Sequence, residues 1–482
     1  MGIRRSGRGA GRPSERLRQP QPLLRRRIAS GRGATDQPNV TGDGDVPLTA
    51  RFWLTVVLTG VGAGLFGIVL MLLLGAVARL AFGPGAVEDF QGAVERASWP
   101  GRVIPLLVAA VVAGVGWFLL RRYVSGRSDA DDAVWTGDGR LGFRRSAGTS
   151  VLSVTVVGLG ASLGREAAPK LMGAVCGSVL AGRAGLTTPQ RRLLVACGAG
   201  AGLACVYNVP LGGALFTAEV LIGAVRLPVM LPALACSAVA TLTAWIGLPS
   251  GPVYADLPDF AFSASALVWA VPAGVLTGLV AVVFVRLIAW ASHRVPRGRG
   301  MLVAPLAAFA VLAALGLAFP QLYGNGQDIA EQAFAGIGAL WLFAALFALK
   351  PLVTVLCLGS GASGGLFTPT LACGAALGAC LGGLWSLLWP GTPVGAYAMI
   401  GAAAMIGAGM QAPLAGLALV LELTHTGFGL MVPMMVATLL ATAMSRWVDG
   451  YSIYSARLPE RAAAGRASGG QQQVDEPPGP LR

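Results

Sequence analysis

Long apolar stretches recur through this chain and constrain its fold more than any other feature. A helix needs roughly 20 apolar residues to cross the hydrocarbon of a bilayer. Stretches such as 54–80 are apolar on all sides and lack the strict alternation of a spanning β-barrel. With 55% apolar and only 12% charged residues, we expect an all-α polytopic membrane protein. The stretches fall near residues 52–82, 103–120, 148–184, 192–225, 227–247, 264–291, 301–319, 337–358, 366–389, 396–425 and 428–447.

Arginine dominates the first 50 residues and supplies much of the net charge of +14. These arginines are mixed with Gly, Pro and Ser without an apolar period, so we predict a basic, disordered, cytoplasmic tail over 1–50. The tail either anchors the chain to anionic lipid or sets its topology through the positive-inside rule. Its charge is not spread like a nucleic-acid-binding surface, so no nucleic-acid partner is expected. Residues 459–482, rich in Gly, Gln and Pro, are predicted to form a second disordered cytoplasmic tail.

A second basic segment, residues 121–145, lies two predicted spans beyond the first tail. Positive residues collect on the cytoplasmic side of membrane proteins, and two crossings return the chain to the side where it started. We therefore predict a multi-pass protein of the cell membrane with both termini in the cytoplasm. The arginines of this segment are Arg121, Arg122, Arg127, Arg140, Arg144 and Arg145.

Cysteine and histidine form no pattern typical of a metal site or a catalytic centre. The cysteines are single residues inside apolar stretches, as small packing side chains are, and His293 and His425 belong to no ligand motif. We expect no resident metal or cofactor and no catalytic residue. The alternative class, a polytopic membrane enzyme or a carrier of organic substrates, would need ionisable residues clustered at one membrane depth. We find no such cluster and expect the protein not to be an enzyme.

An internal repeat at an offset of about 200 residues relates the two halves of the apolar region. The first repeat covers about 52–250 and the second about 264–447. In both, Pro-Leu-x-Gly is followed six residues later by glutamate, which composition alone does not explain. Glu219 and Glu422 are these glutamates, and their equivalent places indicate a shared capping or structural role. The other aligned residues are Gly160, Ala161, Ser162, Gly164, Gly173, Ala174 and Gly177 with Gly361, Ala362, Ser363, Gly365, Gly374, Ala375 and Gly378, then Gly198, Ala199, Ala201, Pro210, Leu211 and Gly213 with Gly401, Ala402, Ala404, Pro413, Leu414 and Gly416.

Glycine precedes a predicted helix start at the same place in both repeats, in Gly164-Arg165-Glu166 and in Gly365-Leu366-Phe367. Halves with an odd number of crossings must be inverted in the membrane, and this builds a site at the midplane from broken helices. Helix N-termini at that depth present unpaired N–H groups and the positive end of the helix dipole, which attract anions. The pattern therefore favours an anion pathway. The alternative is that these glycines only allow helices to pack closely.

These residues resemble the CLC family of chloride channels and chloride/proton exchangers. The family motif G-R-E-G-P corresponds to Gly164-Arg165-Glu166-Ala167-Ala168, and the motif G-x-F-x-P is complete as Gly365-Leu366-Phe367-Thr368-Pro369. The likeness covers residues 51–458, and the short stretch that follows fits the prokaryotic type without CBS domains. It implies a CLC-like inverted repeat of broken, tilted transmembrane helices, a homodimer with one pore per subunit, and transmembrane chloride transport.

The resemblance also implies roles for single residues. Glu166 would be the gating glutamate, which occupies the anion path when charged and leaves it when protonated or displaced; the alternative is a structural acid at a helix start. The hydroxyl of Tyr454 would touch the central ion. Ser125 is the best fit to the serine of a third, degraded motif, with registers on Gly126 or Ser128 left open. The predicted anion-binding residues are Ser125, Gly164, Arg165, Leu366, Phe367 and Tyr454.

Two residues depart from the family pattern. Lys170 lies one turn beyond Glu166 on a helix that is normally apolar there, and it could attract anions, pair with Glu166 or extend to an interface. Val220 follows Glu219 where exchangers of the family carry a second, proton-passing glutamate. Because valine carries no proton, we expect passive or weakly proton-coupled chloride transport. The alternative is a chloride/proton antiporter in which protons take a water route.

Overall fold

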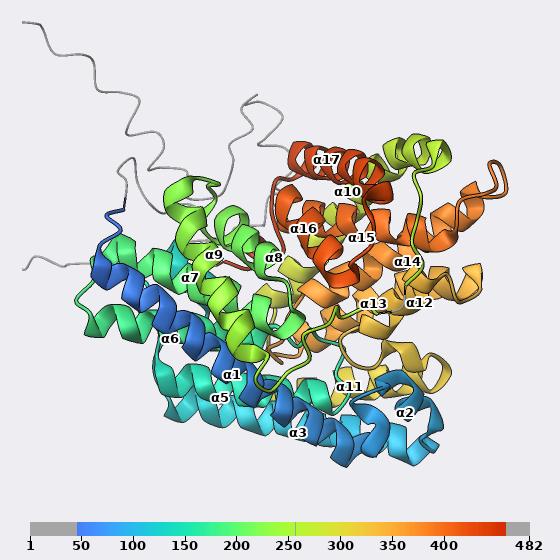
Figure 1. Ribbon diagram of the computed structural model, residues 1–482. Coiled ribbons are helices and arrows are strands. Elements are labelled where there is room, and N and C mark those ends of the chain that lie inside the picture. Colours follow the sequence, from blue (N-terminus) through green and yellow to red (C-terminus); the bar gives the residue numbers. More distant parts are fainter. Residues whose placement is uncertain (1–45, 256, 459–482) are drawn as a thin grey trace, which may run out of the picture. The chain divides into compact units, whose positions relative to one another are not determined.

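The computed structural model describes residues 46–255 and 257–458, and helices dominate this part of the chain. Both predicted tails lie outside the described residues, apart from residues 46–50. The elements in chain order are α1 (Ala50–Phe82), η2 (Pro84–Ala86), α2 (Phe90–Arg96), α3 (Trp99–Tyr123), α4 (Ala130–Trp135), α5 (Phe143–Gly158), α6 (Ala167–Arg183), α7 (Thr188–Tyr207), α8 (Pro210–Leu215), η3 (Phe216–Ile222), α9 (Leu227–Ala244), α10 (Ala264–His293), α11 (Gly300–Ala318), η4 (Pro320–Leu322), α12 (Gln327–Ala335), α13 (Leu340–Gly359), α14 (Phe367–Trp385), α15 (Val394–Met410), α16 (Pro413–Thr424), η5 (Phe428–Leu430), α17 (Met431–Val448) and η6 (Ser455–Arg457) (Figure 1).

Eight helical segments of the described residues are long and apolar enough to cross a membrane. Large apolar side chains on them are exposed, for instance Leu72 of α1 and Leu242 of α9, as contact with lipid requires. The segments are α1, α3, α9, α10, α11, α13, α14 and Phe428–Val448, which contains α17. The prediction of an all-α, multi-pass membrane protein is confirmed.

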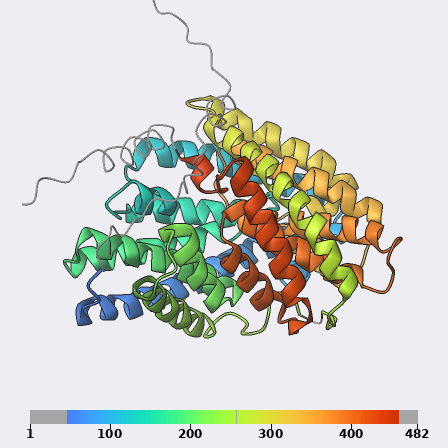
Figure 2. The ribbon, with the colours of Figure 1, turned by 90° about the horizontal axis from the view of Figure 1, so that it is seen from above.

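The repeat in the sequence is also a repeat in space. Helix α6 packs against α7 as α14 packs against α15, and α7 packs against α9 as α15 packs against α17. Asn208 ends α7 and Gln411 ends α15 in the left-handed conformation, with φ values of 55° and 57°. A proline starts the next helix two residues later in each half. Helices α10 and α17 lie side by side in two views of the fold (Figure 1 and Figure 2).

Glycines on facing helices let the backbones of each half approach closely. A Cβ atom added to Gly173 of α6 would overlap the carbonyl oxygen of Gly198 on α7. In the second half, a Cβ atom on Gly374 of α14 would lie 2.7 Å from the carbonyl oxygen of Gly401 on α15. Close packing through small residues is how transmembrane helices associate without a hydrophobic driving force. These four glycines therefore serve packing, which separates them from the glycines at the helix breaks.

Each of the two equivalent glutamates caps a helix of the other repeat. Glu219 accepts hydrogen bonds from the N–H groups of Leu414 and Ala415 at the start of α16, at 3.3 and 2.6 Å. Glu422 accepts from Leu211 and Gly212 at the start of α8, at 2.9 and 2.6 Å. A carboxylate at a helix N-terminus satisfies N–H groups that have no partner within the helix. The predicted capping role is confirmed, and its cross-repeat geometry joins the halves.

Candidate anion site

The helix breaks of the two repeats meet inside the protein. Gly164 and Gly365 exchange two backbone hydrogen bonds, each 2.8 Å long, as an isolated antiparallel bridge. Helix α6 begins three residues after the first glycine and α14 two residues after the second. An antiparallel meeting of equivalent loops is the arrangement that an inverted repeat produces. The sequence predicted equivalent helix breaks in the two repeats, and the structure brings these breaks into contact.

Glu166 lies buried at this junction, with 3% of its surface exposed. Its Oε1 accepts a hydrogen bond from the backbone N–H of Phe367 at 2.8 Å, and its Oε2 accepts one from the Tyr207 hydroxyl at 3.1 Å. The hydroxyl of Thr368 lies 3.4 Å from Oε2. The carboxylate thus sits on the N-terminus of α14, where backbone N–H groups and the helix dipole bind a negative charge.

Glycine is required on both sides of this carboxylate. A Cβ atom built on Gly164 or on Gly365 would overlap the Glu166 side chain. The glycines of the two motifs therefore leave space for a charged group as well as pairing the loops. This observation supports the anion interpretation of the motifs over helix packing alone.

Tyr207 and Thr368 were not among the predicted site residues. Their hydroxyls lie 2.6 Å apart, and both contact the Glu166 carboxylate. Thr368 occupies a variable position of the G-x-F-x-P motif, and Tyr207 is the last residue of α7, next to the left-handed Asn208. Neither position carried a signal in the sequence that separated it from ordinary packing. The predicted residue Arg165 joins them, because its guanidinium lies 5.0 Å from the centre of the Tyr207 ring.

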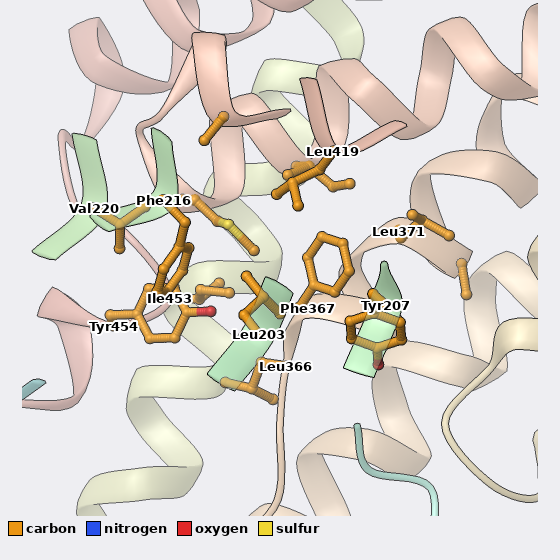
Figure 3. Close-up of a cluster of buried hydrophobic side chains, with 14 of the residues drawn as sticks. Leu203, Tyr207, Phe216, Val220, Leu366, Phe367, Leu371, Leu419, Ile453 and Tyr454 are labelled. Atoms are coloured by element: carbon orange, nitrogen blue, oxygen red, sulfur yellow. The ribbon is translucent and has the colours of Figure 1, made fainter. Parts of the chain in front are cut away.

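Tyr454 lies in a cluster of buried hydrophobic side chains that also contains Leu366 and Phe367 (Figure 3). Because Tyr207, Phe216, Phe367 and Tyr454 are its largest members, it is named the aromatic cluster. The buried Tyr454 ring packs edge-on against Phe216 with centroids 5.6 Å apart, while Phe367 packs against Tyr207 at 5.5 Å. Figure 3 shows the Tyr454 hydroxyl turned into this cluster. The structure therefore brings Gly164, Arg165, Leu366 and Phe367 together at Glu166, and Tyr454 lies in the same cluster as Leu366 and Phe367.

Ser125 differs from these residues. It lies in the loop between α3 and α4, is exposed, and makes no side-chain hydrogen bond within the described part of the chain. Its part in binding an anion stays a prediction.

Lys170 has a partner that the sequence did not indicate. Its ammonium group lies 3.0 and 2.9 Å from the two carboxylate oxygens of Asp131 on α4. The alternative in which Lys170 pairs with Glu166 is wrong, because Asp131 holds the ammonium group and only 12% of the Lys170 side chain is exposed. Asp131 is distant in sequence and reaches Lys170 through the packing of α4 on α6, which helix spacing cannot predict.

Val220 is buried in η3, a π-helical turn between α8 and α9. Its side chain lies in the aromatic cluster near Phe216 and Tyr454 (Figure 3). A valine here offers no group that could bind a proton.

Among the described residues, no three His, Cys, Asp or Glu side chains are grouped to hold a metal ion.

The sequence matches the family described as voltage gated chloride channel over residues 106–446, which is more than half of the chain. The chain belongs to this family. A voltage-gated ClC-type chloride channel, ClcB, of Citrobacter koseri is 31% identical over 373 residues, covering 74% of this chain and 87% of that protein. An H+/Cl− exchange transporter, ClcA, of Vibrio parahaemolyticus is 29% identical over 385 residues, covering 74% and 81%. The resemblance inferred from the motifs is thus confirmed.

A solved structure of a slow cyanobacterial Cl−/H+ antiporter has the same fold. Its TM-score with this chain is 0.75 at 21% identity, and the match covers 87% of this chain and 100% of that chain. The CLC-like inverted repeat of broken transmembrane helices is confirmed by this likeness.

Proposed function

We propose that this CLC protein transports chloride across the cell membrane through the site around Glu166, passively or with weak proton coupling. The observation that carries the proposal is the position of the Glu166 carboxylate. A negatively charged group lies at the meeting point of the two repeats, bound by the backbone N–H of Phe367 at the N-terminus of α14. A site that binds one anion through N–H groups and a helix dipole suits chloride, because a monovalent anion needs only hydrogen-bond donors and a positive potential.

Gating follows from the charge of Glu166. While the carboxylate is ionised, it holds the N–H of Phe367 and blocks the site for another anion. Protonation removes the charge that the helix N-terminus stabilises. The neutral side chain then binds this site less strongly than chloride does. The hydroxyls of Tyr207 and Thr368 then become free to donate to the entering ion. Glu166 is accordingly proposed as the gate, with acid favouring the open state.

The remaining predicted residues are proposed as parts of the pathway. Backbone groups at Gly164, Leu366 and Phe367 would line it, and Arg165 would raise its positive potential. The Tyr454 hydroxyl would donate to an ion in the aromatic cluster, and Ser125 would bind the anion from the loop between α3 and α4.

Chloride/proton exchange is the second candidate. ClcA of Vibrio parahaemolyticus is described as an exchanger, so the family includes relatives of that kind. Passive or weakly coupled transport is favoured here because Val220 places a group without a titratable proton in the buried η3 turn. Proton movement through hydrocarbon requires titratable groups or water at each step.

The setting of the protein is proposed from the same resemblance. We propose a homodimer in which each subunit has its own pathway, with both termini in the cytoplasm and the segment 121–145 on that side. The protein is proposed to act as a transporter without enzymatic activity or a resident cofactor.

Chloride efflux from liposomes tests the proposed function. The purified full chain is reconstituted into vesicles loaded with chloride, and a potassium ionophore balances the charge. We expect efflux well above that of protein-free vesicles and faster efflux when the medium is acidified. Vesicles that retain chloride at every pH, with the protein folded and inserted, would contradict the proposal.

A further inference from the structure

The buried ion pair of Lys170 and Asp131 has no part in the function derived above. Lys170 lies one helical turn from Glu166 on α6, so its charge is close to the proposed pathway. The side chains of Lys170 and Asp131 are only 12% and 9% exposed. A buried charge is costly unless it is paired. Each of these groups therefore needs an opposite charge in place.

The ammonium group of Lys170 also contacts the aromatic cluster. It lies 4.4 Å from the centre of the Tyr454 ring and 5.7 Å from the centre of the Phe216 ring. Aromatic faces attract cations but do not cancel a full charge, so Asp131 remains the counter-ion. Because Tyr454 is a proposed ion ligand, the positive charge of Lys170 lies close to an anion bound at Tyr454.

A cavity of about 270 Å³ opens onto Asp131 of this ion pair, and Lys170 is not one of its lining residues. Several water molecules or a small anion with some of its hydration fit into such a space. Asp129 in its lining is exposed, so the cavity connects Asp131 with the surface. The lining residues are Asp129, Asp131, Asp132, Tyr454, Arg457 and Leu458.

We propose that Lys170 is a second anion-binding site, for chloride or another small anion, which Asp131 occupies when ionised and vacates when protonated. This inference rests on the proposed function and extends it to the end of the pathway next to Tyr454. Lys170 binds one negative charge at a time. A proton taken up by Asp131 is therefore matched by one anion taken up by Lys170, and the buried charge stays balanced.

The groups around Asp131 agree with a carboxylate that can be protonated. Burial raises the pKa of Asp131 above its ordinary value, and the positive charge of Lys170 opposes that rise. Asp129 raises the pKa further, and Arg457 lowers it. Asp132 is held by Arg127 at 3.0 Å and is partly neutralised.

The other elements packed against α4 direct their charges elsewhere. From α7, Arg192 donates to the carbonyl of Gly137 and Arg191 faces Asp138. From η3, Glu219 caps α16. Lys170 is thus the positive side chain that holds Asp131 directly.

Chloride flux in a Glu166→Gln background isolates the second site. The substitution removes the titration of Glu166, so the pH dependence that remains reports another group. We expect flux to rise as the pH falls on the cytoplasmic side, where the segment 121–145 is proposed to lie, because burial raises the pKa of Asp131 and favours its protonated form. Adding Asp131→Asn should make flux high and independent of pH. Adding Asp138→Asn, the matched control at a carboxylate outside the cavity lining, should leave the profile of Glu166→Gln unchanged.

Chloride binding by calorimetry tests Lys170 itself. Loss of a charge-assisted contact in Lys170→Met should weaken binding at acidic pH by about tenfold or more. Because this variant leaves Asp131 buried and unpaired, the pair Asp131→Asn with Lys170→Met provides a second form without an unpaired charge. It should show the same weak binding.

The results separate this inference from the proposed function. Chloride flux through Glu166→Gln that ignores both pH and Asp131→Asn would overturn the second site alone. Unchanged chloride affinity in the doubly substituted form would overturn it as well. Absence of chloride flux in wild type and in every variant would overturn the proposed function.

Discussion

Glu166 is the residue on which the account depends most. Replacing it with Gln removes the charge that competes with chloride while keeping the shape of the side chain. We expect Glu166→Gln to conduct more chloride than wild type at neutral pH and to lose the dependence on external pH. In wild type, flux should rise by up to about tenfold per pH unit as the pH falls, since the protonated fraction of an ionised carboxyl changes by that factor. Flux measurements that give the variant the wild-type response to external pH would assign the gate to another acid.

Tyr454 can be tested by removing its hydroxyl alone. Tyr454→Phe keeps the ring against Phe216 and Lys170 but removes the proposed donor to the ion. A lost hydrogen bond contributes about 1 kcal/mol, so chloride affinity should fall by about fivefold. Calorimetry with chloride measures the change, and Tyr323→Phe, which alters a buried tyrosine bonded to the carbonyl of Arg102, is the control. Equal chloride affinity in Tyr454→Phe and wild type would exclude this role.

Single residues show where sequence reasoning ends. Glu166, Phe367 and the paired glycines could be predicted because motif and repeat marked the same places twice. Asp131 and Tyr207 could not, because each reaches the site through packing of elements far apart in the chain. The alternative pairing of Lys170 with Glu166 failed for the same reason, since helix spacing considers only neighbours on one helix.

At the scale of elements, the crossed caps hold α8 and α16 together. Substituting Glu219 or Glu422 with Ala leaves N–H groups at the start of the opposite helix without a partner. We expect each substitution to lower the free energy of unfolding by about 1–2 kcal/mol. Thermal unfolding in detergent measures the effect, and Glu88→Ala on the exposed surface is the control. Equal unfolding temperatures for the two cap variants and the control would contradict the reciprocal capping.

The positions of the helix breaks could be predicted from the sequence. The backbone pairing between them could not. The predicted apolar stretch 148–184 holds two helices, because a loop separates α5 from α6 and pairs with its counterpart between α13 and α14. Glycine at Gly160 and Gly361 takes φ values of 101° and 98°, which favours this residue at the end of each first helix. The repeat supplied this information because one break alone would have resembled ordinary helix packing.

At the scale of the whole molecule, hydropathy and the repeat were sufficient for the fold class. Apolar length selects helices because backbone groups must be satisfied within the hydrocarbon. Short elements such as α4 and α12 were not anticipated, since six and nine residues carry too little periodicity. Such elements nevertheless supply Asp131 and therefore the second proposed site.

The reversal potential of purified protein in liposomes tests the central claim most directly. With a chloride gradient and equal pH on both sides, we predict a potential at or near the chloride equilibrium value. An added pH gradient should leave that potential unchanged for a passive pathway and shift it only slightly under weak coupling, because Val220 cannot pass protons. A potential that ignores the chloride gradient would contradict chloride transport, and one that follows the pH gradient in fixed proportion would replace passive transport with exchange.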